Sequence, residues 1–333
     1  MKDFEYKYKV LVRCVTYNQS AYIIDALNGF TMQETNFPFV CTIIDDASTD
    51  GEQGVIRHYL QENFDLNEHG TVRQEESDDY TLVFARHKTN TNCFFVVLFL
   101  KYNHYSIWKD KHIYIKKWIE ESKYSALCEG DDYWTDPLKL QKQVDFMDSH
   151  SDFSMCFHGA DVIIDSGDYS TFDNSMHDNL EEREYTGLEL ARRWQIPTAS
   201  MLYRSIIEHP RDRNLLSGDV SLQLQCAKEG RVYCMSESMS VYRRTAGGVS
   251  LRMKGYSILQ RVDRLLAFIY YFPEFKEPFE EGLVKLLGTH FYSKYLFNTL
   301  SVVFKRREVF RYFMTGVKSE FKPTIDRLVH NNR

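Results

Sequence analysis

The sequence is poor in the features that mark secreted, membrane-spanning or nucleic-acid-binding proteins. Its first residues lack the apolar core of a signal peptide, and its longest strictly apolar run, Cys93–Leu100, is far shorter than the roughly 20 residues that span a bilayer. The net charge is −6, so no overall basic character favours a nucleic acid as partner. These absences predict a soluble, cytoplasmic chain without a nucleic-acid partner.

Paired cysteine spacings are also missing. The seven cysteines are odd in number and form no CxxC motif, which argues against a disulfide framework and against a zinc site. We interpret them as reduced, mostly buried thiols. They stand at Cys14, Cys41, Cys93, Cys128, Cys156, Cys226 and Cys234.

What the chain does contain is an alternation of apolar strands and amphipathic helices. With 333 residues, 43% of them hydrophobic, it can form one large domain or a smaller domain with an appendage. The segments Lys9–Val15 and Phe39–Ile44 are continuously apolar or β-branched, and helical spacing of apolar residues follows each of them. This pattern predicts an α/β fold with a mostly parallel sheet covered on both faces.

Polar clusters follow three of the predicted strands, at Tyr17–Asn18, Asp45–Asp46 and Glu129–Trp134. In open α/β sheets, ligands bind outside the carboxyl ends of the strands. The third cluster holds Glu129, Asp131 and Asp132 within four residues, so water or a cation must screen their charges. The alternative is a solvated acidic turn in which Thr135 or Asp136 caps the next helix.

Taken in order, Val15–Asn18, Ile44–Gly51 and Cys128–Trp134 resemble the motifs of the family 2 glycosyltransferases. These nucleotide-sugar enzymes have the GT-A fold, and the similarity is strongest to bacterial members that build surface polysaccharides. The resemblance covers about residues 8 to 250. It implies a catalytic domain of residues 1–250 with a Rossmann-like sheet flanked by helices, and we assign residues 251–333 to a helical C-terminal extension.

The resemblance implies a donor site in which oxygen ligands hold Mn²⁺ or Mg²⁺, and the cation stabilises the negative charge of the diphosphate. Asp132 is then the metal ligand and Asp131 lies nearer the ribose or sugar. Tyr17 stacks on the base, and Asp46 accepts a hydrogen bond from uracil N3. The alternative for Asp45 and Asp46 is an Asp-rich turn before Gly51. The expected donor-nucleotide residues are Val15, Tyr17, Asn18, Asp46, Asp131, Arg243 and Arg244.

An inverting transferase needs a general base for the acceptor hydroxyl, and the resemblance implies Asp219. Gly218 stands where the family often carries a first acid, which leaves one candidate. The alternative is that Asp219 is a helix N-cap.

The segment Glu237–Ser250 has the form of a loop that closes over the diphosphate, with Thr245 where relatives often carry a His. Weaker expectations for the acceptor or sugar side are Glu129, Trp134, Trp194 and Thr198, although Trp194 can equally be a core residue.

The predicted function is therefore metal-dependent, inverting transfer of a sugar from a UDP-sugar to a saccharide or lipid-linked saccharide. Residues 251–333 either cover the sheet or rest as a basic, aromatic surface on an anionic membrane. Two other classes remain open. A sugar-phosphate nucleotidyltransferase would normally carry a Gly-rich phosphate loop, and none follows Val10–Val15. A non-catalytic saccharide-binding protein would need none of the three acidic sites.

Overall fold

The computed structural model describes residues 5–67, 73–168, 170, 180–193, 195–215, 217–246, 248, 255–291 and 296–316. The chain divides into two compact units. The first comprises Met1–Tyr185, Gln195–Glu208 and Cys226–Gly247, and the second comprises Thr186–Trp194, His209–Gln225 and Gly248–Arg333. The last border lies close to the boundary expected at residue 250, but two earlier segments belong with the C-terminal helices.

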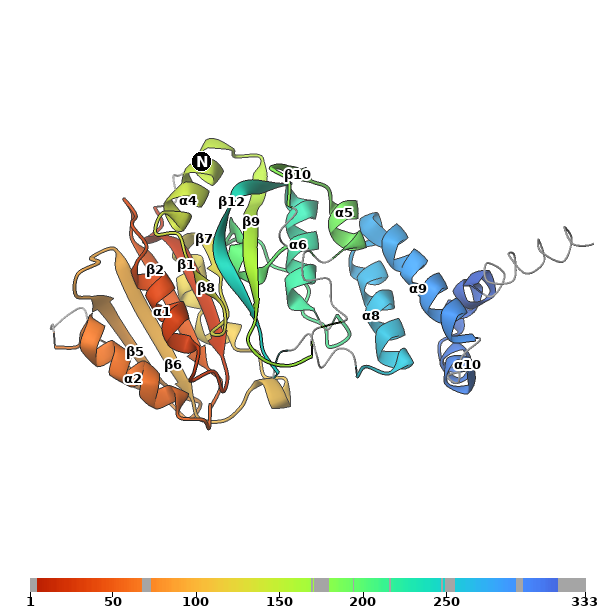
Figure 1. The fold of residues 1–333 in the computed structure, drawn as a ribbon, viewed down its shortest axis with the longest axis horizontal. Helices are drawn as coiled ribbons and strands as arrows, with labels where there is room; N and C mark the ends of the chain where they lie inside the picture. Colours follow the sequence, from red (N-terminus) through yellow and green to blue (C-terminus); the bar gives the residue numbers. More distant parts are fainter. Residues whose placement is uncertain are drawn as a thin grey trace, which may run out of the picture. The chain divides into compact units, whose positions relative to one another are not determined.

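The centre of the first unit is a set of neighbouring parallel strands in the order β7-β1-β2-β6 (Figure 1). These are β1 (Tyr8–Thr16), β2 (Phe39–Asp45), β6 (Cys93–Leu100) and β7 (Ser122–Leu127). Every residue of β2 is buried, because side chains pack on both faces of this part of the sheet. The predicted parallel core is confirmed.

Antiparallel strands extend the sheet on both sides of this core. Beyond β6 lie β5 (Tyr80–His87), β3 (Phe64–Asp65) and β4 (Arg73–Glu76). Beyond β7, the short β11 (Leu202–Arg204) pairs antiparallel with both β7 and β9 (Phe153–Ile164). The strand β12 (Arg231–Arg244) runs parallel to β9 and also pairs with β8 (Tyr133–Trp134) and β10 (Arg183–Tyr185).

Helices cover the sheet where apolar spacing predicted them. Figure 1 shows α1 (Ile23–Thr31) and α2 (Glu52–Asn63) beside the parallel strands, and their buried residues share one core with α4 (Lys139–Ser149). The opposite face packs against the segment around α3 (Lys116–Glu120), through Ile115 and Trp118.

The helix α4 begins later than expected. Leu138 is its N-cap without a side-chain cap, although Asp136 Oδ1 accepts a hydrogen bond from the Leu138 N–H at 2.8 Å.

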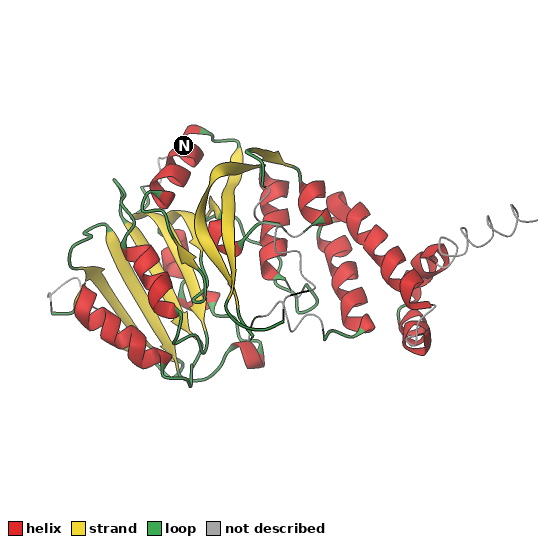
Figure 2. Cartoon of the chain, viewed as in Figure 1, coloured by secondary structure: helices red, strands yellow, loops and turns green. Residues whose placement is uncertain are grey.

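The second unit is helical, as expected for the C-terminal region (Figure 2). Capping boxes start two of its helices, with Thr186 at α5 (Gly187–Arg192) and Ser257 at α8 (Ile258–Tyr271). The buried faces of α8 and α9 (Lys276–Phe291) meet in a core that includes Val262, Leu283 and Leu287. Within the described residues, no helix has the length and apolar character needed to cross a membrane. The unit also contains α10 (Leu296–Lys305) and residues 218–225 of α6 (Gly218–Glu229).

Candidate functional site

The three predicted polar clusters meet at one edge of the sheet. Because β1, β2 and β7 are parallel neighbours, their carboxyl ends lie side by side, with Thr16 opposite Asp45. The backbone N–H of Gly130 donates to Val15 O at 3.3 Å, and that of Asp46 donates to Thr16 O at 3.0 Å. A Cβ at Gly130 would lie 2.7 Å from Thr16 Cβ, so any larger residue would push the acidic loop away from the end of β1.

Asp132 is the most deeply buried carboxylate of the acidic cluster, with 1% exposure. Its Oδ1 accepts a hydrogen bond from the Arg243 N–H at 2.8 Å. Its Oδ2 is buried and has no hydrogen-bond partner among the described residues. Burial raises the pKa of Asp132 well above its usual range, and the nearby charges of Asp131 and Glu129 raise it further. A cation at Oδ2 would stabilise the charged form of Asp132 and so lower its pKa.

Arg243 holds the acidic cluster rather than projecting from a loop. Its guanidinium donates to Asp131 O at 3.0 Å and to Asp25 Oδ2 at 2.7 Å. The guanidinium carbon also lies 4.7 Å from the ring centroid of Tyr22. Arg243 is 8% exposed, so most of its charge is engaged by the protein itself.

The expected loop Glu237–Ser250 is a strand over its first half. Residues 237–244 lie in β12, because they pair with β9 and β8. Arg244 is also buried, and its carbonyl oxygen accepts from the Asp165 N–H at 3.0 Å. Gly247, Val249 and Ser250 lie outside the described residues.

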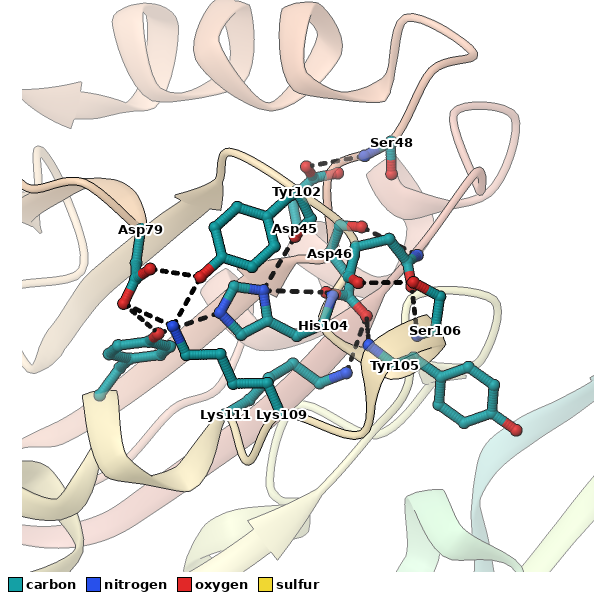
Figure 3. Close-up of polar contacts among 12 residues, drawn as sticks. Asp45, Asp46, Ser48, Asp79, Tyr102, His104, Tyr105, Ser106, Lys109 and Lys111 are labelled. Carbon is teal, nitrogen blue, oxygen red and sulfur yellow. Dashed lines mark hydrogen bonds and ion pairs between the residues drawn. The ribbon is translucent and has the colours of Figure 1, made fainter.

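Asp46 lies at the predicted edge, where both of its carboxylate oxygens already accept hydrogen bonds from other residues of the protein (Figure 3). Oδ1 accepts from the His104 N–H at 2.7 Å, and Oδ2 accepts from the Tyr105 N–H at 3.0 Å and from Lys111 Nζ at 2.8 Å. The residue is 1% exposed. Its neighbour Asp45 accepts from the Ser48 N–H at 3.1 Å, which is the turn geometry that the alternative interpretation expected.

The segment that binds Asp46 was not predicted to contribute to the site. His104 is buried, and its Nδ1 and Nε2 contact Tyr102 O at 2.8 Å and Tyr114 Oη at 2.9 Å. Lys109 donates to Asp79, which lies between β4 and β5 (Figure 3). Tyr114 donates to the same carboxylate. No local spacing connects Asp46 with residues 104–111, so periodicity could not have found these contacts.

The end of β1 offers exposed apolar surface. Tyr17 is 43% exposed and Val15 is 37% exposed, so both side chains are available to a ligand. Asn18 adopts a left-handed conformation, with φ of 54°, which asparagine tolerates better than most residues. Its Oδ1 accepts from the Thr49 N–H at 2.7 Å and ties the β1 loop to the β2 loop.

Glu52 is a second unpredicted member of this edge. It is fully buried at the start of α2, where it accepts hydrogen bonds from Thr16 Oγ1, from the Gln19 N–H at 2.8 Å and from Ser48 Oγ at 2.8 Å. An acidic residue in the first turn of a predicted helix was a visible signal, but it normally indicates a solvated charge. Its burial depends on the approach of the β1 loop.

The weaker acceptor-side expectations divide. Trp134 is in the core at 2% exposure, with Nε1 donating to Ala199 O at 2.8 Å, so it offers no ring face to a sugar. Its burial follows from the β8–β12 pairing and the packing of Phe30 against its ring.

The other acceptor-side residues differ in exposure. Thr198 is half-buried in a 3₁₀ turn, Glu129 is exposed, and Trp194 lies outside the described residues.

Asp219 lies in the first turn of α6 rather than at an N-cap, because the helix begins at Gly218. Its segment belongs to the second unit, and the acidic cluster belongs to the first. Within the second unit, Asp219 acts on Arg264 of α8: burial lowers the pKa of Arg264, and the negative charge of Asp219 opposes that shift.

No model of a protein family matches the chain. Among curated proteins, it is 33% identical over 240 residues to the uncharacterized proteins Mb1547 of Mycobacterium bovis and Rv1520 of Mycobacterium tuberculosis. The match covers 71% of this chain and 58% of each relative, so the chain spans less than two thirds of their length.

Among solved structures, the chain is similar to residues 1–349 of TarS from S. aureus, both in complex with UDP and without it. The TM-score is 0.51 at 17% sequence identity, and the similarity covers 86% of this chain and 73% of that chain. The predicted α/β fold is therefore confirmed: the chain shares the fold of residues 1–349 of TarS.

Proposed function

We propose that the chain is a metal-dependent, inverting glycosyltransferase that uses a nucleotide-sugar donor, with UDP-sugars as the favoured class. The observation that carries this proposal is the buried Oδ2 of Asp132, which has no partner among the described residues and lies at the carboxyl edge of parallel strands. The chain's fold is similar to that of TarS, whose residues 1–349 have been solved in complex with UDP.

The acidic cluster fits a divalent cation that the nucleotide helps to hold. Among the described residues, no group of three or more His, Cys, Asp or Glu side chains is placed to hold a metal ion. Mg²⁺ is often bound by one or two carboxylates, substrate phosphates and water, which suits Asp132 with Asp131 beside it. When bound, Mn²⁺ or Mg²⁺ supplies positive charge that stabilises the leaving diphosphate.

The chain's own residues bind and orient the nucleotide. Tyr17 and Val15 present exposed apolar surface for the base. Asp46 Oδ1 accepts one protein hydrogen bond, and a carboxylate oxygen can accept a second, so N3–H of uracil remains its proposed ligand. Because Arg243 is bound to Asp131 and Asp25, its proposed role is to position the acidic cluster beside the diphosphate.

Asp219 remains the proposed general base for the acceptor hydroxyl. The proposed acceptor is a saccharide or lipid-linked saccharide of bacterial surface polysaccharide synthesis, as the motif resemblance implies. We also propose a cytoplasmic location with peripheral membrane contact through residues 251–333. No described contact favours a nucleotidyltransferase or a non-catalytic saccharide-binding protein over this function.

The test is calorimetric titration of UDP with and without Mn²⁺, on the wild type and on Asp132→Asn. Loss of the charged oxygen should weaken Mn²⁺-dependent UDP binding by at least about tenfold, roughly 1.4 kcal/mol. Asp145→Asn is the matched control, because Asp145 is a carboxylate of α4 that contacts Gln141 instead. Equal affinity with and without Mn²⁺ would reject the metal site, and absence of UDP binding would reject the donor class.

A further inference from the structure

The two ring nitrogens of His104 face different oxygen atoms, and each contact constrains a proton. The side chain is fully buried beside Asp46. Its Nδ1 lies 2.8 Å from the carbonyl oxygen of Tyr102, and a carbonyl oxygen can only accept a hydrogen bond. Nδ1 must therefore carry a proton. Its Nε2 lies 2.9 Å from Tyr114 Oη, so the second contact depends on where the hydroxyl proton of Tyr114 goes.

The hydroxyl proton of Tyr114 is used by a carboxylate. Tyr114 Oη donates to Asp79 Oδ2 at 2.7 Å. Asp79 also accepts from Lys109 Nζ at 2.8 Å and from the hydroxyl of Tyr102. These bonds, with that from Lys109 contributing most, lower the pKa of Asp79 below its usual range, so its carboxylate is ionised and only accepts. Tyr114 Oη must then accept from Nε2 of His104, and both ring nitrogens carry protons.

We propose that His104 is a positioning residue held as an imidazolium, which anchors the segment that orients Asp46. The two ring contacts fix residue 104, whose backbone N–H donates to Asp46 Oδ1 at 2.7 Å (Figure 3). The N–H of the next residue, Tyr105, donates to Oδ2 at 3.0 Å. This inference rests on the proposed function, because Asp46 is taken as the residue that reads the base.

The groups around His104 suit a cation. The imidazole Nδ1 lies 4.0 Å from Asp46 Oδ1, and the ring of Tyr102 stacks on the imidazole with the centroids 4.5 Å apart. The two neighbouring lysines are each paired with a carboxylate, which reduces their repulsion. The titratable groups that face the ring or its partners are Asp46, Asp79, Tyr102, Tyr114, Lys109 and Lys111.

A neutral ring could not keep both contacts. With one N–H left, either Nδ1 turns a lone pair toward the Tyr102 carbonyl, or Tyr114 withdraws its proton from Asp79 to donate to Nε2. The anchoring is therefore complete at low pH and is lost as pH rises and the second ring proton leaves. UDP affinity should decline with it.

NMR of ligand-free protein with ¹⁵N-labelled histidine tests the charge directly. A histidine in an ordinary environment is mostly neutral at about pH 7.5, whereas we expect two protonated ring nitrogens for His104. His104→Gln lacks these resonances and so assigns them. Tyr114→Phe removes the acceptor of Nε2 and should give a neutral ring. The matched control is Tyr80→Phe, because the Tyr80 hydroxyl donates to Glu75 instead, and it should keep the imidazolium.

UDP affinity in the presence of Mn²⁺ tests the positioning role in the same buffers, from about pH 6 to about pH 9. At the lower end, Tyr114→Phe should bind UDP about threefold to tenfold more weakly than the wild type, which corresponds to about one hydrogen bond. This difference should shrink as the wild-type ring loses its second proton, and Tyr80→Phe should follow the wild type throughout.

Two results would overturn the inference. One is a bare ring nitrogen of His104 in the wild type where two protonated nitrogens are expected. The other is an affinity difference that does not follow the protonation of the ring across the pH series. Absence of UDP binding in the wild type and every variant would instead reject the proposed function, and the ¹⁵N resonances alone would then decide the state of His104.

Discussion

Lys139 shows how burial changes a single charged residue. It lies fully buried in the first turn of α4, where Nζ donates to Gln143 Oε1 at 2.7 Å and lies 4.1 Å from the ring centroid of Trp134. Burial lowers the pKa of Lys139 to about 7. In the unfolded chain a lysine titrates near 10.4, so the unfolded state binds more protons between these values. Folding stability should therefore rise with pH across this interval.

Replacing this lysine should remove that pH dependence. Between about pH 7 and about pH 9, the unfolding free energy of the wild type should rise by about 1–2 kcal/mol relative to Lys139→Met. Denaturant unfolding at several pH values measures the difference. The matched control is Lys142→Met, one turn along α4, whose ion pair with Asp136 raises the pKa of Lys142, so it stays protonated throughout. If the unfolding free energies of the wild type and Lys139→Met change with pH in parallel, Lys139 stays charged when buried.

The acidic loop and the end of β1 are two elements that must approach closely. Gly130 makes this possible, because a Cβ there would overlap Thr16 and lie 2.6 Å from Gln19 Oε1. Gly130→Ala should push the loop away from β1 and weaken UDP binding by about tenfold, while costing about 1–3 kcal/mol of stability.

Calorimetry with UDP and a thermal melt test this contact between elements. Gly54→Ala is the control, because a Cβ at Gly54 in α2 meets nothing within 4 Å. That control should keep UDP affinity and gain roughly 0.5–1 kcal/mol of stability from helix propensity. If Gly130→Ala binds UDP as the wild type does, the approach of these two elements does not shape the donor site.

At the scale of the whole molecule, each of the two units has a hydrophobic core of its own. The second unit depends on a close contact between α9 and the helical residues after Val309. A Cβ at Gly316 would lie 2.9 Å from the backbone nitrogen of Gly288, and backbone atoms cannot move aside as a side chain can. The core around Leu283 and Leu287 lies in this unit.

Gly316→Ala should therefore destabilise the second unit by about 1–3 kcal/mol. Hydrogen exchange should show lost protection in α8 and α9, with protection of β1 and β2 unchanged. Gly282→Ala serves as the control, because its nearest neighbour would be a flexible Leu265 methyl group at 3.4 Å. Equal loss of protection in the strands of the first unit would show that the two units unfold together.

The sequence by itself determined the features that depend on neighbouring residues. The apolar periodicity of β1, α1, β2 and α2 gave their places correctly, because side-chain direction repeats along a strand or helix. The clusters at Tyr17, Asp45 and Glu129 were expected at one edge because parallel strands end together. The cysteines were expected to be reduced and mostly buried, and all seven are free and buried.

Only the tertiary structure decided which distant groups meet. Asp46 is bound by Lys111, and Arg243 reaches Asp25, across separations of 65 and 218 residues that no periodic pattern records. Trp134 became core, Glu52 became a buried carboxyl, and residues 209–225 joined the C-terminal helices. In each case burial, and with it the charge state and the hydrogen-bond partners, depends on segments that the folding of the whole chain brings together.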